Sequence, residues 1–479
     1  MRKAKIVGTL GPSSDSVDKI AELIRAGLNV ARINMSHGTH EGHEQVIKNV
    51  REASRLVERE VAILLDLQGP KIRVDKLTSP LKLEDGSTWV IGHSDVKDQY
   101  PEYKDCFIPT IYEDLVNDCE DGTRILFDDG YITAKALSRD RDVYKIKIQV
   151  GGELKSNKGI NLPDADVSAP SFTKKDHEDL MFGLTQEIDY VALSFVRKKE
   201  DILHVMNILH KLKLHIPIVA KIEKPQAVEN LDEIMEVTDV IMVARGDMGV
   251  EVGNHLVPSI QKEIITKCNR RGVPVITATQ MLESMISHVY PTRAESSDVA
   301  NAVWDGTDAL MLSGETASGK FPIEAVKMMS SIINEAEKIP KPRPLIKEMD
   351  LSSVDSAVML SASLVAEKTG AKRILSVTES GNSCLRMSRF RPTTPVLGIT
   401  NNIETVRRIC LYWGVHPFYL TEYDEDSLSL QNDVLYMIKE DLGLQGGDKI
   451  VFTRGDGKFF SKGSSNSIRV EVIKNNPPS

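Results

Sequence analysis

The sequence is poor in cysteine. Only 5 of its 479 residues are cysteines, and no two of them form a C-x-x-C pair. Structural zinc sites and disulfide frameworks need closely spaced cysteines, so we expect reduced, packed thiols and no zinc site.

Long apolar runs are also missing. The longest, such as Val61–Leu65 and Val240–Ala244, have the length of a buried strand, far below the ~20 residues of a membrane-spanning helix. The N-terminal segment has basic residues but no apolar stretch typical of a secretory signal. We therefore expect no membrane partner and a cytoplasmic location.

An excess of positive charge is absent as well. The chain has 60 Lys and Arg against 69 Asp and Glu, a formal net charge of -9. This balance argues against a nucleic-acid partner. Its 41% hydrophobic and 27% charged residues are typical of a globular protein, and the length suits about three domains.

The sequence does contain a repeated alternation of short apolar runs and longer helical patterns. Nearly continuous apolar runs are typical of parallel strands buried on both faces. Eight such strand–helix units predict an α/β fold, a (β/α)8 TIM barrel. The predicted strands are Lys5–Leu10, Asn29–Asn34, Val61–Leu67, Tyr190–Phe195, Ile216–Ile222, Val240–Ala244, Pro274–Ala278 and Ala309–Leu312. The helices are expected at about 16–26, 40–59, 174–185, 198–211, 226–236, 256–271, 293–304 and 322–337, with Thr173 as the cap of the third.

The third unit is interrupted after Val74 by short alternating stretches and turn signals, which predict an inserted small β-barrel. Because insertions in βα loops lie over the catalytic mouth, we expect a lid. A proline-rich linker at 339–344 leads to a predicted C-terminal doubly wound α/β domain. Its helices are expected near 353–369, 383–390, 403–411 and 428–441. The predicted domains are 1–70 with 170–340 for the barrel, 71–169 for the lid and 341–479 for the C-terminal domain.

Polar and charged residues follow seven of the eight predicted barrel strands. For any single strand end, the exposure of loops to solvent is enough to explain polar residues. Seven ends that hold both cations and carboxylates favour one shared anion-plus-metal site. Glu223 and Asp247 offer oxygen ligands of the kind that Mg2+ or Mn2+ prefers. The alternative is a structural salt bridge from Glu223 to Lys221 or Arg245.

The motifs at these ends resemble the pyruvate kinase family over nearly the whole chain. The matching segments are Lys5–Pro12, Arg32–Gly38, Gly69–Arg73, Ala220–Glu223, Ala244–Asp247, Ala278–Met285, Pro291–Glu295 and Met311–Ala317. The resemblance implies Mg2+-dependent transfer of a phosphoryl group from phosphoenolpyruvate to ADP, giving pyruvate and ATP, the final step of glycolysis. It also implies a homotetramer.

The resemblance assigns roles by position. Lys221 would stabilise the transferring phosphoryl group, and Glu223 and Asp247 would hold the metal. The catalytic set implied by the resemblance is Lys221, Arg73, Thr279 and Ser313, of which Thr279 and Ser313 would serve a water chain that protonates the enolate. The substrate would contact Arg32, Lys221, Gly246, Asp247 and Thr279, and the nucleotide would contact His37, Arg73 and Lys198.

The sequence departs from the family pattern at a monovalent-cation pocket. Many members bind K+ through residues matching Asn34, Ser36, Asp66 and the backbone of Leu67, with a nearby Glu. Here Leu67 and Gln68 precede Lys71, which stands at the Glu position. We expect the Lys71 ammonium to fill this pocket, so that K+ is not required. The alternative is that Lys71 points to solvent.

The C-terminal domain resembles the family's effector domain. A predicted strand is followed by hydroxyl and amide residues that open a helix, a setting that binds phosphate. The implied effector is a phosphorylated sugar or a nucleotide monophosphate, and the alternative is an ordinary capping loop. Its residues are Thr378, Ser380, Gly381, Asn382 and Ser383.

Two other functions stay open from the residues alone. A barrel aldolase or lyase could use a similar metal on pyruvate-like substrates. A non-catalytic metabolite sensor could keep only the C-terminal pocket. Neither explains Lys221, Glu223 and Asp247 together with a lid and a C-terminal domain.

Overall fold

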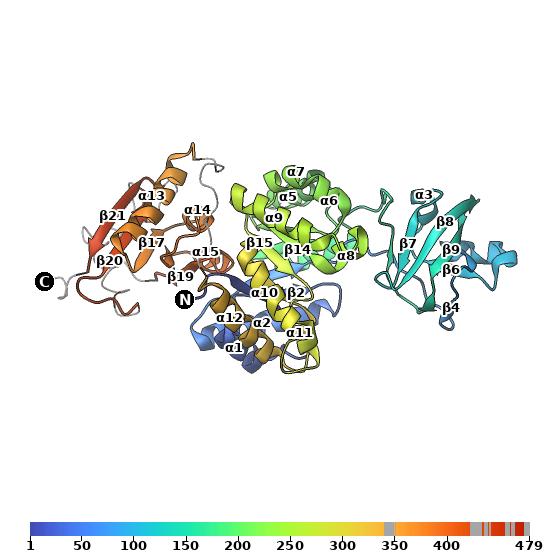
Figure 1. Cartoon of the computed structure of the whole chain (residues 1–479), viewed down its shortest axis with the longest axis horizontal. Coiled ribbons are helices and arrows are strands. Elements are labelled where there is room, and N and C mark those ends of the chain that lie inside the picture. Colours follow the sequence, from blue (N-terminus) through green and yellow to red (C-terminus); the bar gives the residue numbers. More distant parts are fainter. Residues whose placement is uncertain are drawn as a thin grey trace.

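Figure 1 shows a central barrel that lies between an inserted β lid and a C-terminal α/β layer. The computed structural model of the chain describes residues 1–339, 349, 351–421, 434, 439, 442–455, 460 and 465–473. The linker predicted from Pro340 onward, and the helix predicted at 428–441 apart from two of its residues, lie outside the described residues. The predicted domain boundaries stay predictions.

Eight parallel strands close into the predicted TIM barrel, in the order β1-β16-β15-β14-β13-β12-β3-β2. Side chains alternate along each strand. Ile6 and Ile63 join the core that the strands share with the surrounding helices, whereas Val7 and Leu64 belong to a second core. The strands are β1 (Lys5–Thr9), β2 (Val30–Asn34), β3 (Ala62–Asp66), β12 (Tyr190–Leu193), β13 (Ile218–Ile222), β14 (Val240–Ala244), β15 (Val275–Ala278) and β16 (Ala309–Leu312).

Helices surround the barrel (Figure 1). Their starts follow local capping chemistry, since Thr173 and Thr292 each form a capping box with the third helical residue. The helix predicted at 226–236 is two helices, because Asn230 ends the first and its side chain donates to the carbonyl of Arg197. The helices are α1 (Val17–Ala26), α2 (His40–Val57), α4 (Lys174–Leu184), α5 (Lys199–Lys211), α6 (Pro225–Glu229), α7 (Leu231–Val237), α8 (Arg245–Val252), α9 (Val257–Arg271), η3 (Glu283–Ile286), α10 (Arg293–Asp305), α11 (Gly314–Ala317) and α12 (Pro322–Ala336).

The insert after β3 is an antiparallel half-barrel. Its main sheet has the order β11-β7-β8-β9-β5-β6, and only β5 and β6 pair in parallel. A separate ribbon joins β10 to β4. The elements are β4 (Leu81–Leu83), β5 (Thr88–His93), η1 (Ser94–Gln99), η2 (Pro101–Tyr103), β6 (Phe107–Thr110), α3 (Leu115–Asp118), β7 (Arg124–Phe127), β8 (Ile132–Asp140), β9 (Val143–Val150), β10 (Gly152–Leu154) and β11 (Ile160–Asn161).

The C-terminal layer is a mixed sheet of order β19-β18-β17-β20-β21, in which only β21 runs antiparallel. Its inner face continues the second barrel core, so the two parts share one packed interior. The elements are α13 (Val354–Thr369), β17 (Arg373–Val377), α14 (Asn382–Arg389), β18 (Val396–Thr400), α15 (Ile403–Ile409), β19 (Val415–Tyr419), β20 (Lys449–Arg454) and β21 (Ser467–Val472).

Candidate active site

A buried cluster of charges lies at the carboxyl ends of β2, β3 and β13. The Lys221 ammonium is 3.0 Å from Glu223 Oε1 and 3.4 Å from Asp66 Oδ1. It also donates to Ser194 Oγ at 2.7 Å. Arg32 Nε lies 2.6 Å from the other oxygen of Asp66. Two cations and two carboxylates therefore meet where the polar strand ends predicted a shared site.

The charges in this cluster set one another's pKa. Burial would lower the pKa of Lys221, but Asp66 and Glu223 outweigh it and raise that pKa above its usual value. Burial would raise the pKa of Asp66, yet Lys221 and Arg32 hold it below its usual range. Burial raises the pKa of Glu223 to about 7, with Lys221 opposing and Asp247 adding to the effect. Lys221 thus stays an ammonium, whereas Glu223 is the carboxylate that gains most from an added cation.

Two carboxylate oxygens in this cluster are paired by charge alone. Asp66 Oδ1 and Glu223 Oε1 are buried and face the Lys221 ammonium, but they accept no hydrogen bond of good geometry from the described residues. The other oxygen of Glu223 accepts the backbone N–H of Phe195 at 2.8 Å. The described residues contain no group of three His, Cys, Asp or Glu side chains that could hold a metal ion. A cation held by Glu223 and Asp247 would therefore complete its shell with water and substrate oxygens, as Mg2+ commonly does.

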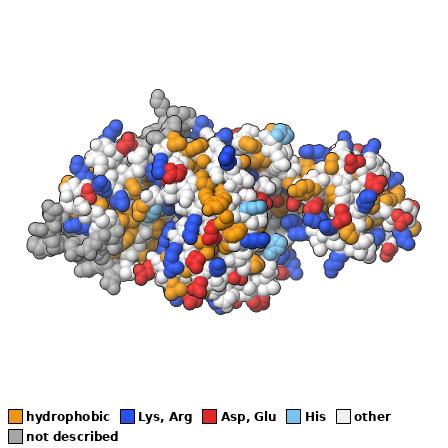
Figure 2. Space-filling view, turned by 60° about the horizontal axis from the view of Figure 1, so that its bottom comes forward, with side chains coloured by type: hydrophobic (Ala, Val, Ile, Leu, Met, Phe, Trp, Pro, Cys, Tyr) orange, Lys and Arg blue, Asp and Glu red, His pale blue; other side chains and the backbone are white. Residues whose placement is uncertain are grey.

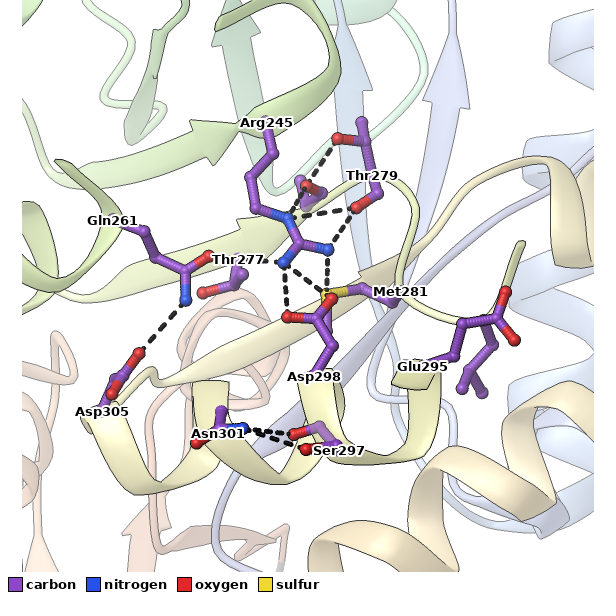
Figure 3. A network of polar contacts seen from close by, with 12 residues as sticks. Arg245, Gln261, Thr277, Thr279, Met281, Glu295, Ser297, Asp298, Asn301 and Asp305 are labelled. Atoms are coloured by element: carbon purple, nitrogen blue, oxygen red, sulfur yellow. Dashed lines mark hydrogen bonds and ion pairs between the residues drawn. The ribbon is translucent and has the colours of Figure 1, made fainter. Parts of the chain in front are cut away.

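The ends of β14 and β15 meet beside this cluster. The N–H of Gly246 donates to Thr279 Oγ1 at 2.8 Å. Arg245 does not pair with Glu223; its guanidinium lies against the loop after β15 and reaches Asp298 (Figure 3). Of the two salt bridges considered for Glu223, the structure thus contains the one to Lys221. Ser313 lies one strand further on, and its N–H donates to Glu315 at 2.7 Å.

Three predicted nucleotide-site residues lie apart from Lys221. His37 and Lys198 are exposed on loops after β2 and β12. Arg73 donates to the carbonyl of Asn157 within the lid at 2.9 Å. The described structure shows no contact between any of these three side chains and Lys221.

The predicted monovalent-cation pocket is assembled only in part. Asn34 Oδ1 accepts the N–H of Ser36 at 3.2 Å, and the Leu67 carbonyl accepts the Ser194 hydroxyl at 2.7 Å. No ion pair joins the Lys71 ammonium to Asp66 among the described contacts, so the filling of the pocket by Lys71 stays a prediction. Lys71 is exposed and lines a cavity between lid and barrel. The reason is the turn at Gly69, whose φ of 69° directs the chain out of the barrel into the lid.

The predicted effector residues form a turn between β17 and α14. Thr378 Oγ1 accepts the N–H of Gly381, which is the N-cap of the helix and has a φ of 89°. Ser380 and Asn382 are exposed, and Ser383 Oγ lies 2.8 Å from Ser465 Oγ.

Several side chains around the site escaped the sequence reasoning. Glu315 also accepts the N–H of Leu282 at 3.1 Å, so it ties the loops after β15 and β16 together. Ser194 links Lys221 to the backbone of Leu67. Arg245, Glu295 and Glu315 stand within the quoted motifs, but only their contacts reveal which neighbours they hold.

Comparisons with known proteins cover almost all of the chain. A family model described as pyruvate kinase, barrel domain, matches residues 1–326, and one described as pyruvate kinase, alpha/beta domain, matches residues 356–471. A pyruvate kinase of Geobacillus stearothermophilus is 43% identical over 98% of this chain and 80% of its own length. Pyruvate kinases of Staphylococcus aureus and Staphylococcus saprophyticus are 40% and 41% identical over 99% of this chain and 81% of theirs.

Proposed function

The chain belongs to the pyruvate kinase family, and from this premise we propose that the cluster around Lys221 is its active site. The enzyme is a phosphotransferase that converts phosphoenolpyruvate and ADP to pyruvate and ATP in glycolysis. The lyase and the sensor considered from the residues are thereby excluded. The observation that carries the proposed site is the buried Lys221 ammonium between the carboxylates of Asp66 and Glu223.

The charges of the cluster suit phosphoryl transfer. This reaction needs positioning and charge neutralisation more than covalent help. Lys221 and Arg32 place two fixed cations where a phosphoryl group gains negative charge. Arg73, His37 and Lys198 would join them at the nucleotide when the lid closes over the barrel mouth.

Gly246 and Thr279 are proposed to hold the substrate carboxylate. The nearest atoms that a Cβ at Gly246 would meet belong to the Thr279 side chain, at an ordinary 3.5 Å, so packing within the chain does not require glycine there. Close approach of a ligand to the backbone does explain it. Thr279 and Ser313 would pass a proton to the enolate through water.

Pyruvate kinases generally need a divalent cation, and the residues present fit one. Glu223 and Asp247 are hard oxygen ligands, and Glu223 Oε1 is paired with Lys221 by charge but accepts no hydrogen bond from the described residues. Mg2+ or Mn2+, when bound there, supplies positive charge that stabilises anionic oxygens. In a pyruvate-forming assay, Asp247→Asn should raise the Mg2+ concentration needed for half-maximal rate by at least tenfold. Asp239→Asn, at the opposite end of the barrel, should not; equal metal requirements in both variants would refute the assignment.

We further propose that the enzyme does not require K+, because a lysine stands at the family's glutamate position. The exposed Lys71 would have to move toward Asp66 as the lid closes. Wild-type activity should be retained in buffers free of K+ and Na+, whereas Lys71→Glu should become K+-dependent. Strong stimulation of the wild type by KCl would contradict this proposal.

The C-terminal turn is proposed to bind a phosphorylated sugar or a nucleotide monophosphate that activates the enzyme. The exposed Ser380 and Asn382 at the start of α14 supply hydroxyl and amide donors for a phosphate. Glu379 adds a carboxylate with one buried oxygen lacking a hydrogen bond, which disfavours a doubly phosphorylated sugar. Ser380→Ala should remove activation by AMP or sugar phosphates and leave the basal rate unchanged. Activation that survives this substitution would argue against the site.

The enzyme is also proposed to form the homotetramer usual in its family and to act in the cytoplasm, where pyruvate kinases are typically found. Figure 2 shows a band of hydrophobic side chains over the middle of the barrel. Exposed apolar residues include Leu256, Val289 and Tyr290, and patches of this kind mark interfaces. No helix among the described residues is long and apolar enough to span a membrane. Light scattering would measure the subunit number.

A further inference from the structure

The loop after β15 has a strained backbone. Thr279 and Gln280 have φ of 68° and 54°, in the left-handed region that residues other than glycine rarely occupy. Threonine is branched at Cβ, which makes this conformation especially unfavourable for it. Such a conformation persists only where neighbouring groups hold it.

The guanidinium of Arg245 is the group that holds this loop (Figure 3). Its Nη2 donates to the Thr279 carbonyl at 2.6 Å, and its Nε lies 3.2 Å from the carbonyls of both Ala278 and Thr279. Nη2 also contacts the sulfur of Met281 at 2.9 Å. A planar guanidinium that donates hydrogen bonds to two successive carbonyls constrains the peptide between them far better than a lysine ammonium does.

The opposite side of the guanidinium is anchored to α10. Arg245 Nη1 lies 2.8 Å from Asp298 Oδ2. The same helix holds the far end of the loop, because Glu295 accepts the N–H of Ser284 at 2.7 Å. The loop is therefore braced at both ends from one helix, and Arg245 makes the connection to its strained residue.

The strained residue contacts the proposed site. Thr279 Oγ1 accepts the N–H of Gly246 and donates to the Ala278 carbonyl at 2.7 Å. Gly246 lies directly between Arg245 and the proposed metal ligand Asp247 in sequence. A rotation of the Thr279 backbone would break the Gly246 contact and displace the hydroxyl.

We propose that Arg245 is a positioning residue for the phosphoryl-transfer reaction: it holds the left-handed Thr279 backbone so that the Thr279 hydroxyl stays at the Gly246 N–H beside Asp247. This inference rests on the proposed roles of Thr279 and Gly246. It predicts an effect on kcat through geometry, without any contact between Arg245 and the substrate. A shift of about 1 Å in a catalytic group costs on the order of 100-fold in rate.

The test compares Arg245→Ala with a matched control at the other end of the barrel. Arg51 is equally buried, and it likewise joins two carbonyls, those of Val61 and Glu187, to an aspartate, Asp189. Both variants lose a buried arginine, so both should lose similar thermal stability. Only Arg245→Ala should have a lower kcat, by about 100-fold. Added methylguanidinium should raise the kcat of this variant at least tenfold. Arg245→Lys, which retains the charge and serves if the alanine variant does not fold, should remain well below wild type.

The dependence on Thr279 is tested by a double variant. Thr279→Ala should lower kcat, and adding Arg245→Ala to it should cause little further loss. An unchanged kcat in both Arg245 variants, or no rescue by methylguanidinium, would overturn the proposal. If Thr279→Ala keeps the wild-type kcat while Arg245→Ala loses it, Arg245 does not act through Thr279, and the role proposed for Thr279 fails as well. The active-site assignment of Lys221 is tested separately, by Lys221→Met.

Discussion

The two ends of the barrel use carboxylates in opposite ways. At the amino ends of the strands, the buried Asp189 and Asp308 and the exposed Asp239 each accept a backbone N–H from a neighbouring strand. At the carboxyl ends, Asp66 and Glu223 instead share the Lys221 ammonium, at 3.4 and 3.0 Å. The amino end therefore uses its carboxylates to bind the backbone of neighbouring strands, whereas the carboxyl end gathers charged side chains around one ammonium.

Arginines from the C-terminal layer complete the amino end. Arg391 lies 2.7 Å from Asp308, and Arg407 lies 3.2 Å from Glu60. The hydroxyl of Tyr190, inside the barrel, donates to the carbonyl of Arg408 at 2.7 Å. Each of these contacts joins the barrel to the C-terminal layer, so the loss of one should affect stability before chemistry.

The comparison predicts its largest effect at Lys221. Lys221→Met should lower kcat by ~10²–10³-fold, because a fixed cation at the reacting group is lost. It should also lower the free energy of unfolding by about 3 kcal/mol, because Asp66 and Glu223 lose their shared cation. A pyruvate-forming assay and urea unfolding measure the two effects. A kcat within tenfold of wild type would place the chemistry elsewhere.

The mirror-image substitution at the amino end is Asp308→Ala. It leaves the buried N–H of Val275 without its acceptor and Arg391 without its carboxylate. We expect the free energy of unfolding to fall by about 3 kcal/mol and kcat to stay within about twofold of wild type. A large loss of kcat in an Asp308→Ala variant that remains folded would contradict the proposal that the amino end is structural and the carboxyl end catalytic.

Lys5 is an exception at the amino end, since it is a cation with no carboxylate against it among its described contacts. It is 2% exposed and donates to the carbonyl of Val415. Burial lowers the pKa of Lys5 to about 7, with Cys410 opposing, whereas an unfolded lysine has a pKa of about 10.4.

Between pH 7 and about 10, therefore, the unfolded chain binds more protons at Lys5 than the folded chain, and this group makes stability rise with pH. Lys5→Met should raise the free energy of unfolding by about 2–4 kcal/mol at pH 7, and the gain should shrink toward pH 10. Urea titrations at pH 7, 8 and 9 measure it. A gain that is independent of pH would show that Lys5 is not the titrating group.

The smallest effect is expected where the lid meets the barrel. The side chain of Asn161 in β11 donates to the fully buried Glu251 in α8 at 2.8 Å. Lys224, which follows the Glu223 strand end, lies 2.6 Å from the same oxygen. Asn161→Ala should weaken the contact between lid and barrel by about 1 kcal/mol. We expect this loss to change KM a few-fold and to leave Tm unchanged. A Tm drop of several degrees without a KM change would make this bond structural only.

Much of the fold could be predicted because its signals are local. Eight apolar runs identified the eight barrel strands, and Thr173 identified a helix start by its own capping bond. The insert and the C-terminal strands followed from a change in pattern. The single helix predicted at 226–236 was wrong, because the contact that divides it joins Asn230 to the distant Arg197.

The site was predictable only as a list of strand ends. Barrel closure explains why Lys221, Glu223 and Asp66 could be expected together, since parallel strands place their ends at one rim. The position of Lys71 could not be predicted, because it depends on a turn that takes the chain into the lid.

The sequence alone determined the order of strands and helices and the polar strand ends, because periodicity and capping act between residues close along the chain. Only the tertiary structure decided which charged side chains are buried away from solvent and which residues they contact. Arg245 illustrates this: its motif is visible in the sequence, but its hydrogen bonds to the Thr279 carbonyl depend on the packing of β14, β15 and α10 against one another. Desolvation and long-range contacts arise from that packing, and no local pattern encodes them.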